Sequence, residues 1–304
     1  MDDQEFAKII ELITQRTGII PLESHKTGIK NYINKRLGEN APKLGGKAVV
    51  STETDKAEAT AKTLTYAGFY TQLLGNREEM INLINSATVN ETYFFREEAQ
   101  FALLQSKIFP ELVAKNPTKR LRLWSAASSS GEEIYSLLLL ANAMGIKTEC
   151  IASDINTKVL ETCKSGVYKK NAVRTVDGAA FHHLLAPYKQ SNGGFVLPKK
   201  LCDQVTRLQI NLSKLENFPK NQDIILIRNV FIYFSNEMKK QILSYIVQES
   251  LAPGGYLFLS MNEVASIETA MLPESIEKNV DGKVFYFRKK IQASIATNTS
   301  KAGV

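Results

Sequence analysis

Strands and helices alternate along the chain from residue 120 onward, and this alternation restricts the possible folds more than any other feature. LRLWSA (121–126) is a short apolar run typical of a buried strand, and GEEIYSLLLLANAM (131–144) is typical of a helix. KTECIASD (147–154) then has the pattern of a second strand. A strand–helix–strand unit with short connections predicts a doubly wound α/β domain with a mainly parallel sheet.

The alternation continues toward the C-terminus with one interruption. Strands are predicted at 223–229, in YLFLS after a Pro-Gly-Gly turn at 253–255, and at 283–289, and helices are predicted at 156–164 and 236–250. The interruption at 165–205 contains several glycines and prolines and short β-like pieces such as FVLP. We predict that it forms a small inserted subdomain of antiparallel strands.

The first part of the chain has helical rather than strand patterns. Phe6, Ile9, Ile10 and Ile13 follow helical spacing over residues 4–16. Further helices are predicted at 26–37, 65–74 and 77–87, whereas small and polar residues at 38–62 indicate a flexible insert. We therefore divide the chain into an all-α N-terminal domain (1–87), a linker with a connecting helix (88–119), the α/β domain (120–290) and a disordered tail (291–304).

Composition limits the cellular setting and the class of site. The N-terminus has no basic segment followed by an apolar one, no apolar run reaches 18 residues, and the three cysteines are widely spaced. We therefore expect a cytoplasmic protein without a membrane span or a metal site. The net charge of +7 fits either a generally basic surface or an anionic partner such as nucleic acid or an acidic protein.

Polar residues follow the predicted strands, where ligands bind in sheets of this kind. Small residues at 125–131 allow a ligand to approach the backbone, but Glu132 and Glu133 at the start of the next helix would repel a pyrophosphate. They suit a cationic, hydroxyl-rich ligand such as S-adenosylmethionine, or they only complement the helix dipole. Asp154 ends the second strand, where it can bind ribose hydroxyls or cap the next helix. Asn211 and Leu212 follow the apolar stretch VTRLQI, and Arg228 and Asn229 end the strand predicted at 223–229.

Five segments occur together in a fixed order: TVNETYFFRE (88–97), LWSAASSSGEEIYS (123–136), ASDI (152–155), IRNVFIYF (227–234) and APGGYLFLSMNE (252–263). This set resembles the CheR family of chemotaxis receptor glutamate methyltransferases, over residues 4–37 and 64–289. The resemblance implies an N-terminal helical domain followed by a Rossmann-like, S-adenosylmethionine-dependent methyltransferase domain with an inserted β-subdomain.

The resemblance also assigns expected roles to matching residues. Asn90, Thr92 and Arg96 are expected to contact the cofactor from the linker, as is one of Glu132 and Glu133, with Glu133 preferred. Asp154 is expected to bind the ribose, Asn211 and Leu212 the adenine, and Arg228 and Asn229 the methionine end of the cofactor. Arg96 and Tyr233 are expected to line the methyl-transfer site.

The implied reaction moves a methyl group from S-adenosylmethionine to receptor glutamates, leaving S-adenosylhomocysteine. A carboxylate acceptor is already ionised at neutral pH and needs no general base. The implied partner is the cytoplasmic part of a methyl-accepting chemotaxis receptor, met by Lys30, Lys35 and Arg36, and the short loop at 189–194 argues against capture of a receptor tether. We expect a monomer that does not bind nucleic acid. The alternatives are a methyltransferase acting on RNA or a small molecule, and a non-catalytic S-adenosylmethionine sensor.

Overall fold

The computed structural model describes residues 2–38, 64–88, 90–115 and 120–291. Within this part of the chain, seven strands form one sheet in the order β5–β2–β1–β6–β7–β9–β8. Their bounds are β1 Leu121–Ala126, β2 Thr148–Asp154, β5 Val205–Gln209, β6 Gln222–Ile227, β7 Leu251–Phe258, β8 Ile276–Asp281 and β9 Val284–Lys289. Strands β5, β2, β1, β6 and β7 run parallel, and β9 is antiparallel to both of its neighbours. The predicted α/β class, with a mainly parallel sheet, is therefore confirmed.

Both faces of the sheet are covered, which explains why its central strands are apolar throughout. Leu123 and Ile224 contribute to a core shared with α5, α6 and α7, whereas Trp124 and Ile225 contribute to a core shared with α10 and α11. These helices span α5 Glu98–Leu103, α6 Phe109–Lys115, α7 Glu132–Ala143, α10 Asn236–Tyr245 and α11 Met261–Ser266. The chain order reverses between β1 and β6, and in open α/β sheets such a switch point forms the binding crevice.

Two strand predictions were wrong in detail. β8 was missed because it is an edge strand whose residues are mostly polar and exposed, so it lacks the pattern of a half-buried strand. The predicted turn at 253–255 lies inside β7, where the register against β6 shifts and Gly254 has a φ of +74°. A turn-like sequence is thus accommodated as an irregularity within a strand.

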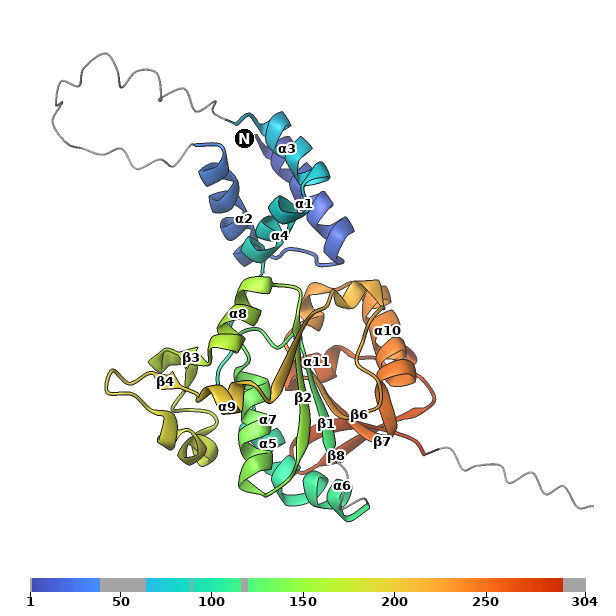
Figure 1. Ribbon diagram of the computed structural model, residues 1–304. Helices are drawn as coiled ribbons and strands as arrows, with labels where there is room; N and C mark the ends of the chain where they lie inside the picture. The colour runs from blue at the N-terminus through green and yellow to red at the C-terminus, as the bar shows by residue number, and fades with distance from the viewer. Residues whose placement is uncertain (1, 39–63, 89, 116–119, 292–304) are drawn as a thin grey trace, which may run out of the picture.

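The interrupting segment contains the expected antiparallel pair, formed by β3 (Val167–Tyr168) and β4 (Phe195–Val196). Three 3₁₀ turns at 170–172, 179–184 and 186–188 make up much of the rest, and helix α9 (Lys199–Cys202) leads back to the large sheet. In Figure 1 this segment projects from the side of the sheet near α7 and α8 (Thr157–Ser165).

The N-terminal part is helical, as predicted. Helices α1 (Asp3–Thr17), α2 (Glu23–Arg36), α3 (Tyr66–Gly75) and α4 (Arg77–Ser86) share a core of their own. Gly18 ends α1 in the left-handed conformation, with a φ of +72°. α2 begins three residues before its predicted start, because Nδ1 of His25 accepts a hydrogen bond from the N–H of Leu22. The insert predicted at 38–62 and the tail predicted at 291–304 lie outside the described residues, apart from Gly38 and Ile291. No described helix combines the length and the apolar character that a membrane crossing needs.

The N-terminal helices lie over the end of the sheet at which the parallel strands finish (Figure 1). The side chain of Asn85 exchanges two hydrogen bonds of 3.0 Å with Thr157 at the start of α8. Asn156 caps α8 through Oδ1, and its Nδ2 donates to Oγ1 of Thr88 at 2.6 Å and to the carbonyl of Asn85 at 3.2 Å. One buried amide therefore both starts a helix and joins the two parts of the chain.

We expect Asn156→Ala to lower the free energy of unfolding by about 2 kcal/mol, because it removes a helix cap and leaves buried groups of the N-terminal part without a donor. Urea denaturation measures this change. Asn31→Ala on the exposed face of α2 is the matched control and should stay within about 0.5 kcal/mol of the parent. Equal effects of the two substitutions would contradict the linking role of Asn156.

Candidate active site

A cavity enclosing about 880 Å³ of empty space, part of it open to solvent, lies beyond the carboxyl ends of β1, β2 and β6. Its lining includes every site residue predicted from the sequence: Asn90, Thr92, Arg96, Glu133, Asp154, Asn211, Leu212, Arg228, Asn229 and Tyr233. The structure thus brings together residues that are up to 143 positions apart in the chain (233 − 90). Their individual roles remain predictions.

Asp154 is buried at the end of β2, and both of its carboxylate oxygens accept backbone hydrogen bonds. Oδ2 accepts from the N–H of Ser129 and Oδ1 from the N–H of Asn156, each at 2.9 Å. Burial raises the pKa of Asp154 to about 6, although these backbone donors act to lower it. The side chain that caps α8 is that of Asn156, so Asp154 is not the helix cap. This leaves ligand binding as the better explanation for a carboxylate held at the cavity wall.

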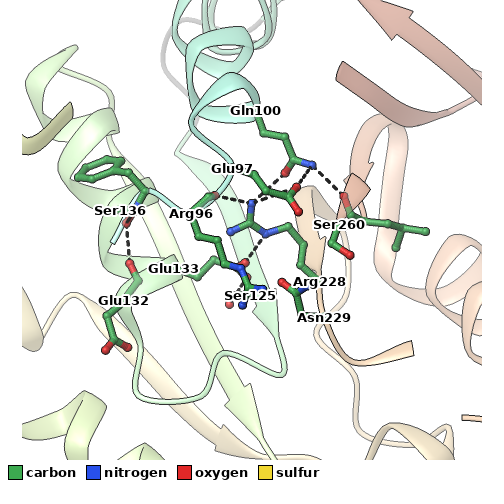
Figure 2. A network of polar contacts seen from close by, with 12 residues as sticks. Arg96, Glu97, Gln100, Ser125, Glu132, Glu133, Ser136, Arg228, Asn229 and Ser260 are labelled. Atoms are coloured by element: carbon green, nitrogen blue, oxygen red, sulfur yellow. Dashed lines mark hydrogen bonds and ion pairs between the residues drawn. The ribbon is translucent and has the colours of Figure 1, made fainter. Parts of the chain in front are cut away.

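The two glutamates at the start of α7 point in different directions (Figure 2). Glu133 lines the cavity, where its Oε1 accepts a 2.6 Å hydrogen bond from the hydroxyl of Ser125. Glu132 accepts from Ser130 at 2.7 Å and lines a neighbouring hollow on the other side of the linker. The sequence left the choice between them open, and the geometry favours Glu133. Gly131 precedes them with a φ of +94°, which a residue with a side chain rarely adopts.

Arg228 is fully buried and forms the centre of the polar network in Figure 2. Its Nε donates to Oε2 of Glu133 at 2.6 Å, and its Nη1 donates to the carbonyl of Arg96 at 2.8 Å and to Oε1 of Gln100 at 3.0 Å. Burial disfavours the charge of Arg228, but the carboxylates of Glu133 and Glu97 outweigh this and raise its pKa. Arg228 therefore ties β6, α7 and α5 together, in addition to lining the cavity.

A buried glutamate that we did not predict fixes the turn after β6. Glu263 in α11 accepts hydrogen bonds of 2.7 Å from the N–H groups of Asn229 and Phe231, and it also accepts from Ser260. It holds Asn229 in the left-handed region, with a φ of +57°. Such backbone strain also occurs at Ala127 and Ser129 after β1 and often marks functional sites. Glu263 is the last residue of the motif APGGYLFLSMNE. Its role could not be predicted from the sequence, because the N–H groups that it binds lie more than 30 residues earlier in the chain.

Arg96 and Tyr233, the predicted methyl-transfer residues, both line the cavity and are partly exposed. Nη1 of Arg96 donates to the carbonyl of Glu91 at 3.1 Å, and its guanidinium lies 5.5 Å from the ring centre of Tyr93. Burial raises the pKa of the Tyr233 phenol, which is therefore neutral at pH 7. Both side chains keep polar atoms that a ligand can use.

Asn211 occupies the predicted place, but its side chain has other partners. Its Nδ2 donates to the carbonyl of Arg16 at 3.0 Å, and its Oδ1 accepts from the N–H of Ser213. The amide therefore connects the end of α1 to the turn after β5, and Leu212 beside it provides an apolar wall. Oδ1 also accepts from the hydroxyl of Ser213 at 3.0 Å, so any contact of Asn211 with adenine would have to use its backbone or the second N–H of its amide.

The N-terminal helical part completes the cavity, which the sequence did not reveal. Ile19, His25 and Ala87 belong to this part and line the same cavity as Asp154. Apolar or singly placed residues of this kind carry no recognisable motif. Only their position over the carboxyl ends of the strands makes them part of the site.

The residues present fit S-adenosylmethionine. Isoleucine and leucine side chains from the segments after β2 and β5 form an apolar wall, Asp154 offers acceptors for hydroxyl groups, and Glu133 balances the charge of Arg228, so that the wall does not repel a cationic ligand. The hydroxyl of Ser128 is buried at the cavity and has no hydrogen-bond partner among the described residues, so a ligand would satisfy it.

Comparison with known proteins identifies the family of this chain. The family model described as the CheR methyltransferase, S-adenosylmethionine-binding domain, matches residues 90–280. The chain belongs to the CheR methyltransferase family. This CheR family member is 32% identical over 272 residues to the chemotaxis protein methyltransferase of Escherichia coli K12, which covers 86% of this chain and 85% of that one.

Two further relatives are similar over most of their length. Chemotaxis protein methyltransferase 1 of Pseudomonas aeruginosa is 33% identical over 272 residues, covering 84% of this chain and 89% of the relative. Chemotaxis protein methyltransferase 2 of Vibrio cholerae is 29% identical over 278 residues, covering 87% and 88%. The CheR family member described here is thus an S-adenosylmethionine-dependent methyltransferase, as its sequence motifs predict.

We expect Glu133→Gln to weaken S-adenosylmethionine binding at least about tenfold, because it leaves the buried positive charge of Arg228 without its partner, next to the site of a cationic ligand. Isothermal titration calorimetry measures the dissociation constant. Glu132→Gln is the matched control: it changes the adjacent buried glutamate, which faces away from the cavity, and should alter the affinity less than about twofold. Equal losses in both variants would show that the helix start, rather than Glu133, matters.

We expect cofactor affinity to fall as the pH drops below about 6. The carboxylate of Asp154 must be ionised to accept hydrogen bonds from two ribose hydroxyls, so binding is strongest above its pKa and weakens as protonation proceeds. Calorimetry between pH 7.5 and pH 5 should show that the association constant for the cofactor decreases, approaching about tenfold per pH unit below the pKa of Asp154. In Asp154→Asn the affinity should be weak throughout, with a much flatter pH profile. An equally steep profile in this variant would assign the effect to another group.

Proposed function

We propose that this CheR family member transfers the methyl group of S-adenosylmethionine to glutamate side chains in the cytoplasmic part of methyl-accepting chemotaxis receptors. The products would be glutamate methyl esters and S-adenosylhomocysteine. The names of the relatives, which are chemotaxis protein methyltransferases aligned over about 85% of both chains, support this proposal.

The structural observation that carries the proposal is the different state of the two arginines in the cavity wall. Arg228 is neutralised by Glu133, whereas Arg96 makes no ion pair with a described carboxylate and bonds to a backbone carbonyl. A partly exposed guanidinium without a carboxylate partner is suited to bind one from a substrate. An acidic acceptor fits this wall better than a neutral one.

The reaction makes modest demands on the protein. Bound S-adenosylmethionine supplies a methyl group activated by the positive charge on sulfur. Arg96 would hold one oxygen of the acceptor carboxylate, so that the other oxygen is aimed at the methyl group. Glu133 and Asp154 would hold the cofactor from the opposite wall, and the ring of Tyr233 would limit the approach of the acceptor. No proton leaves the acceptor, so no general base is required.

Receptor docking through α2 is a further part of the proposal. Lys30 and Lys35 are exposed on this helix, and the ammonium of Lys30 lies 4.7 Å from the ring centre of Phe6. Arg36 instead forms two hydrogen bonds, of 2.8 and 2.9 Å, with the buried Glu79. Its charge is therefore already balanced within the N-terminal part. Lys30 and Lys35 are the better candidates for contact with an acidic receptor surface.

We expect methyl-labelled S-adenosylmethionine to give base-labile label on receptor signalling fragments and none on total RNA. Arg96→Ala should lower kcat/KM for the receptor by about 100-fold, through loss of a charge-assisted hydrogen bond to the acceptor. Arg122→Ala, at a partly exposed arginine of β1 outside the cavity, is the control and should retain activity. Label on RNA alone would overturn the proposal, and cofactor binding without transfer to either substrate would favour a sensor.

A further inference from the structure

His25 lies in the cavity wall although no sequence motif includes it and the match to the family model begins at residue 90. It belongs to the first turn of α2, in the N-terminal helical part, and its side chain is buried. A buried histidine at a methyl-transfer cavity could in principle act as a general base. Its hydrogen bonding indicates a different role.

The hydrogen bond at Nδ1 fixes the protonation state of the ring. The N–H of Leu22 can only donate, and it lies 2.8 Å from Nδ1 of His25. Nδ1 is therefore an acceptor and carries no proton, so the single proton of the neutral ring is on Nε2. Burial lowers the pKa of His25, in agreement with a neutral ring. Neither nitrogen is then free to take a proton from a substrate.

The ring of His25 instead packs against the predicted methyl-transfer tyrosine. The ring centres of His25 and Tyr233 are 4.8 Å apart and the rings meet edge to face at 71°. A second contact holds the backbone, since the N–H of Ile20 donates to the carbonyl of Tyr233 at 2.8 Å. The segment from Ile20 to His25 thus contacts Tyr233 twice, through a hydrogen bond to its backbone and through packing against its ring.

We propose that His25 is a positioning residue for methyl transfer, which sets the ring of Tyr233 at the acceptor side of the cavity. This inference rests on the proposed function, because it takes Tyr233 as part of the methyl-transfer site. It makes the N-terminal helical part a contributor to the chemistry as well as to receptor docking. A small displacement of a group that orients reactants reduces the rate strongly while leaving distant binding contacts intact.

Two substitutions separate the helix cap from the ring contact. His25→Gln keeps an acceptor for the N–H of Leu22, because glutamine is a usual residue at this position of a capping box, but it removes the ring. His25→Phe keeps a ring against Tyr233 and removes the acceptor. His183→Gln, at an exposed histidine outside the cavity, is the control.

We expect His25→Gln to lower kcat about tenfold, with a melting temperature and a cofactor dissociation constant close to those of the parent. His25→Phe should keep more of kcat and lose thermal stability. In a Tyr233→Ala background, His25→Gln should have no further effect on kcat, since the group that it positions is absent. A loss of kcat of the same size with and without Tyr233, or a matching loss of cofactor affinity, would overturn the inference.

A readout without turnover distinguishes this inference from the proposed function. In protein with labelled histidine and tyrosine rings, nuclear Overhauser contacts should join His25 to Tyr233, with the Tyr233 signals identified by their loss in Tyr233→Phe. His25→Gln should shift the Tyr233 ring signals, and His183→Gln should leave them in place. Absence of the contact in the parent overturns the positioning role even if receptors are methylated. If the contact is present but receptors are not methylated, the positioning of Tyr233 by His25 stands and the proposed substrate is wrong.

Discussion

The buried ion pair between Arg228 and Glu133 is the interaction on which the rest of the site depends. Removing two such charges from water costs several kcal/mol per ion, and this is offset only when their geometry and additional hydrogen bonds are good. Here Arg228 also bonds to the carbonyl of Arg96 and to Gln100, while Glu133 accepts from Ser125. The pair therefore joins the ends of β1 and β6 to the start of α7 and to the linker. These elements meet at the switch point of the sheet, so their fixed arrangement determines the shape of the cavity wall that Arg228 and Glu133 form.

Asp154 differs from this ion pair, because no described cation balances its charge and burial disfavours the ionised carboxylate in the folded state. Its folded pKa of about 6 lies above the ordinary value of 3.8, so the folded state holds the proton more tightly than the unfolded chain. The sign of the linkage follows: this group favours folding most below about pH 4, and that contribution is lost as the pH rises toward 6. Two pKa units correspond to roughly 3 kcal/mol as an order of magnitude. A carboxylate kept ionised at neutral pH under such a penalty is suited to a ligand that supplies the missing hydrogen bonds.

The sequence predicts those features of the site that follow from chain direction and local pattern. Glu133, Asp154 and Arg228 could be found because Asp154 ends β2, Arg228 follows β6 and Glu133 lies at the start of the helix after β1, and parallel strands bring their carboxyl ends to one edge. The role of Asn211 as a link to Arg16, and the neutralisation of Arg36 by Glu79, could not be found in this way. Both depend on pairing between segments far apart in the chain. β8 was missed for a related reason: it is held by pairing with β9, while its own residues resemble a loop.

The N-terminal helices illustrate why domain boundaries drawn from sequence are poor boundaries for a site. Residues 90–280 carry the family motifs, yet Ile19, His25 and Ala87 close the cavity from outside this range. The contacts that hold them are hydrogen bonds through Asn85, Asn156 and Asn211, whose amides can donate and accept at once. A cofactor enclosed between the two parts would strengthen their association, because ligand binding stabilises the arrangement that forms the binding site. Any partner that shifts α2 would in turn act on the cavity through His25 and the segment that holds Tyr233.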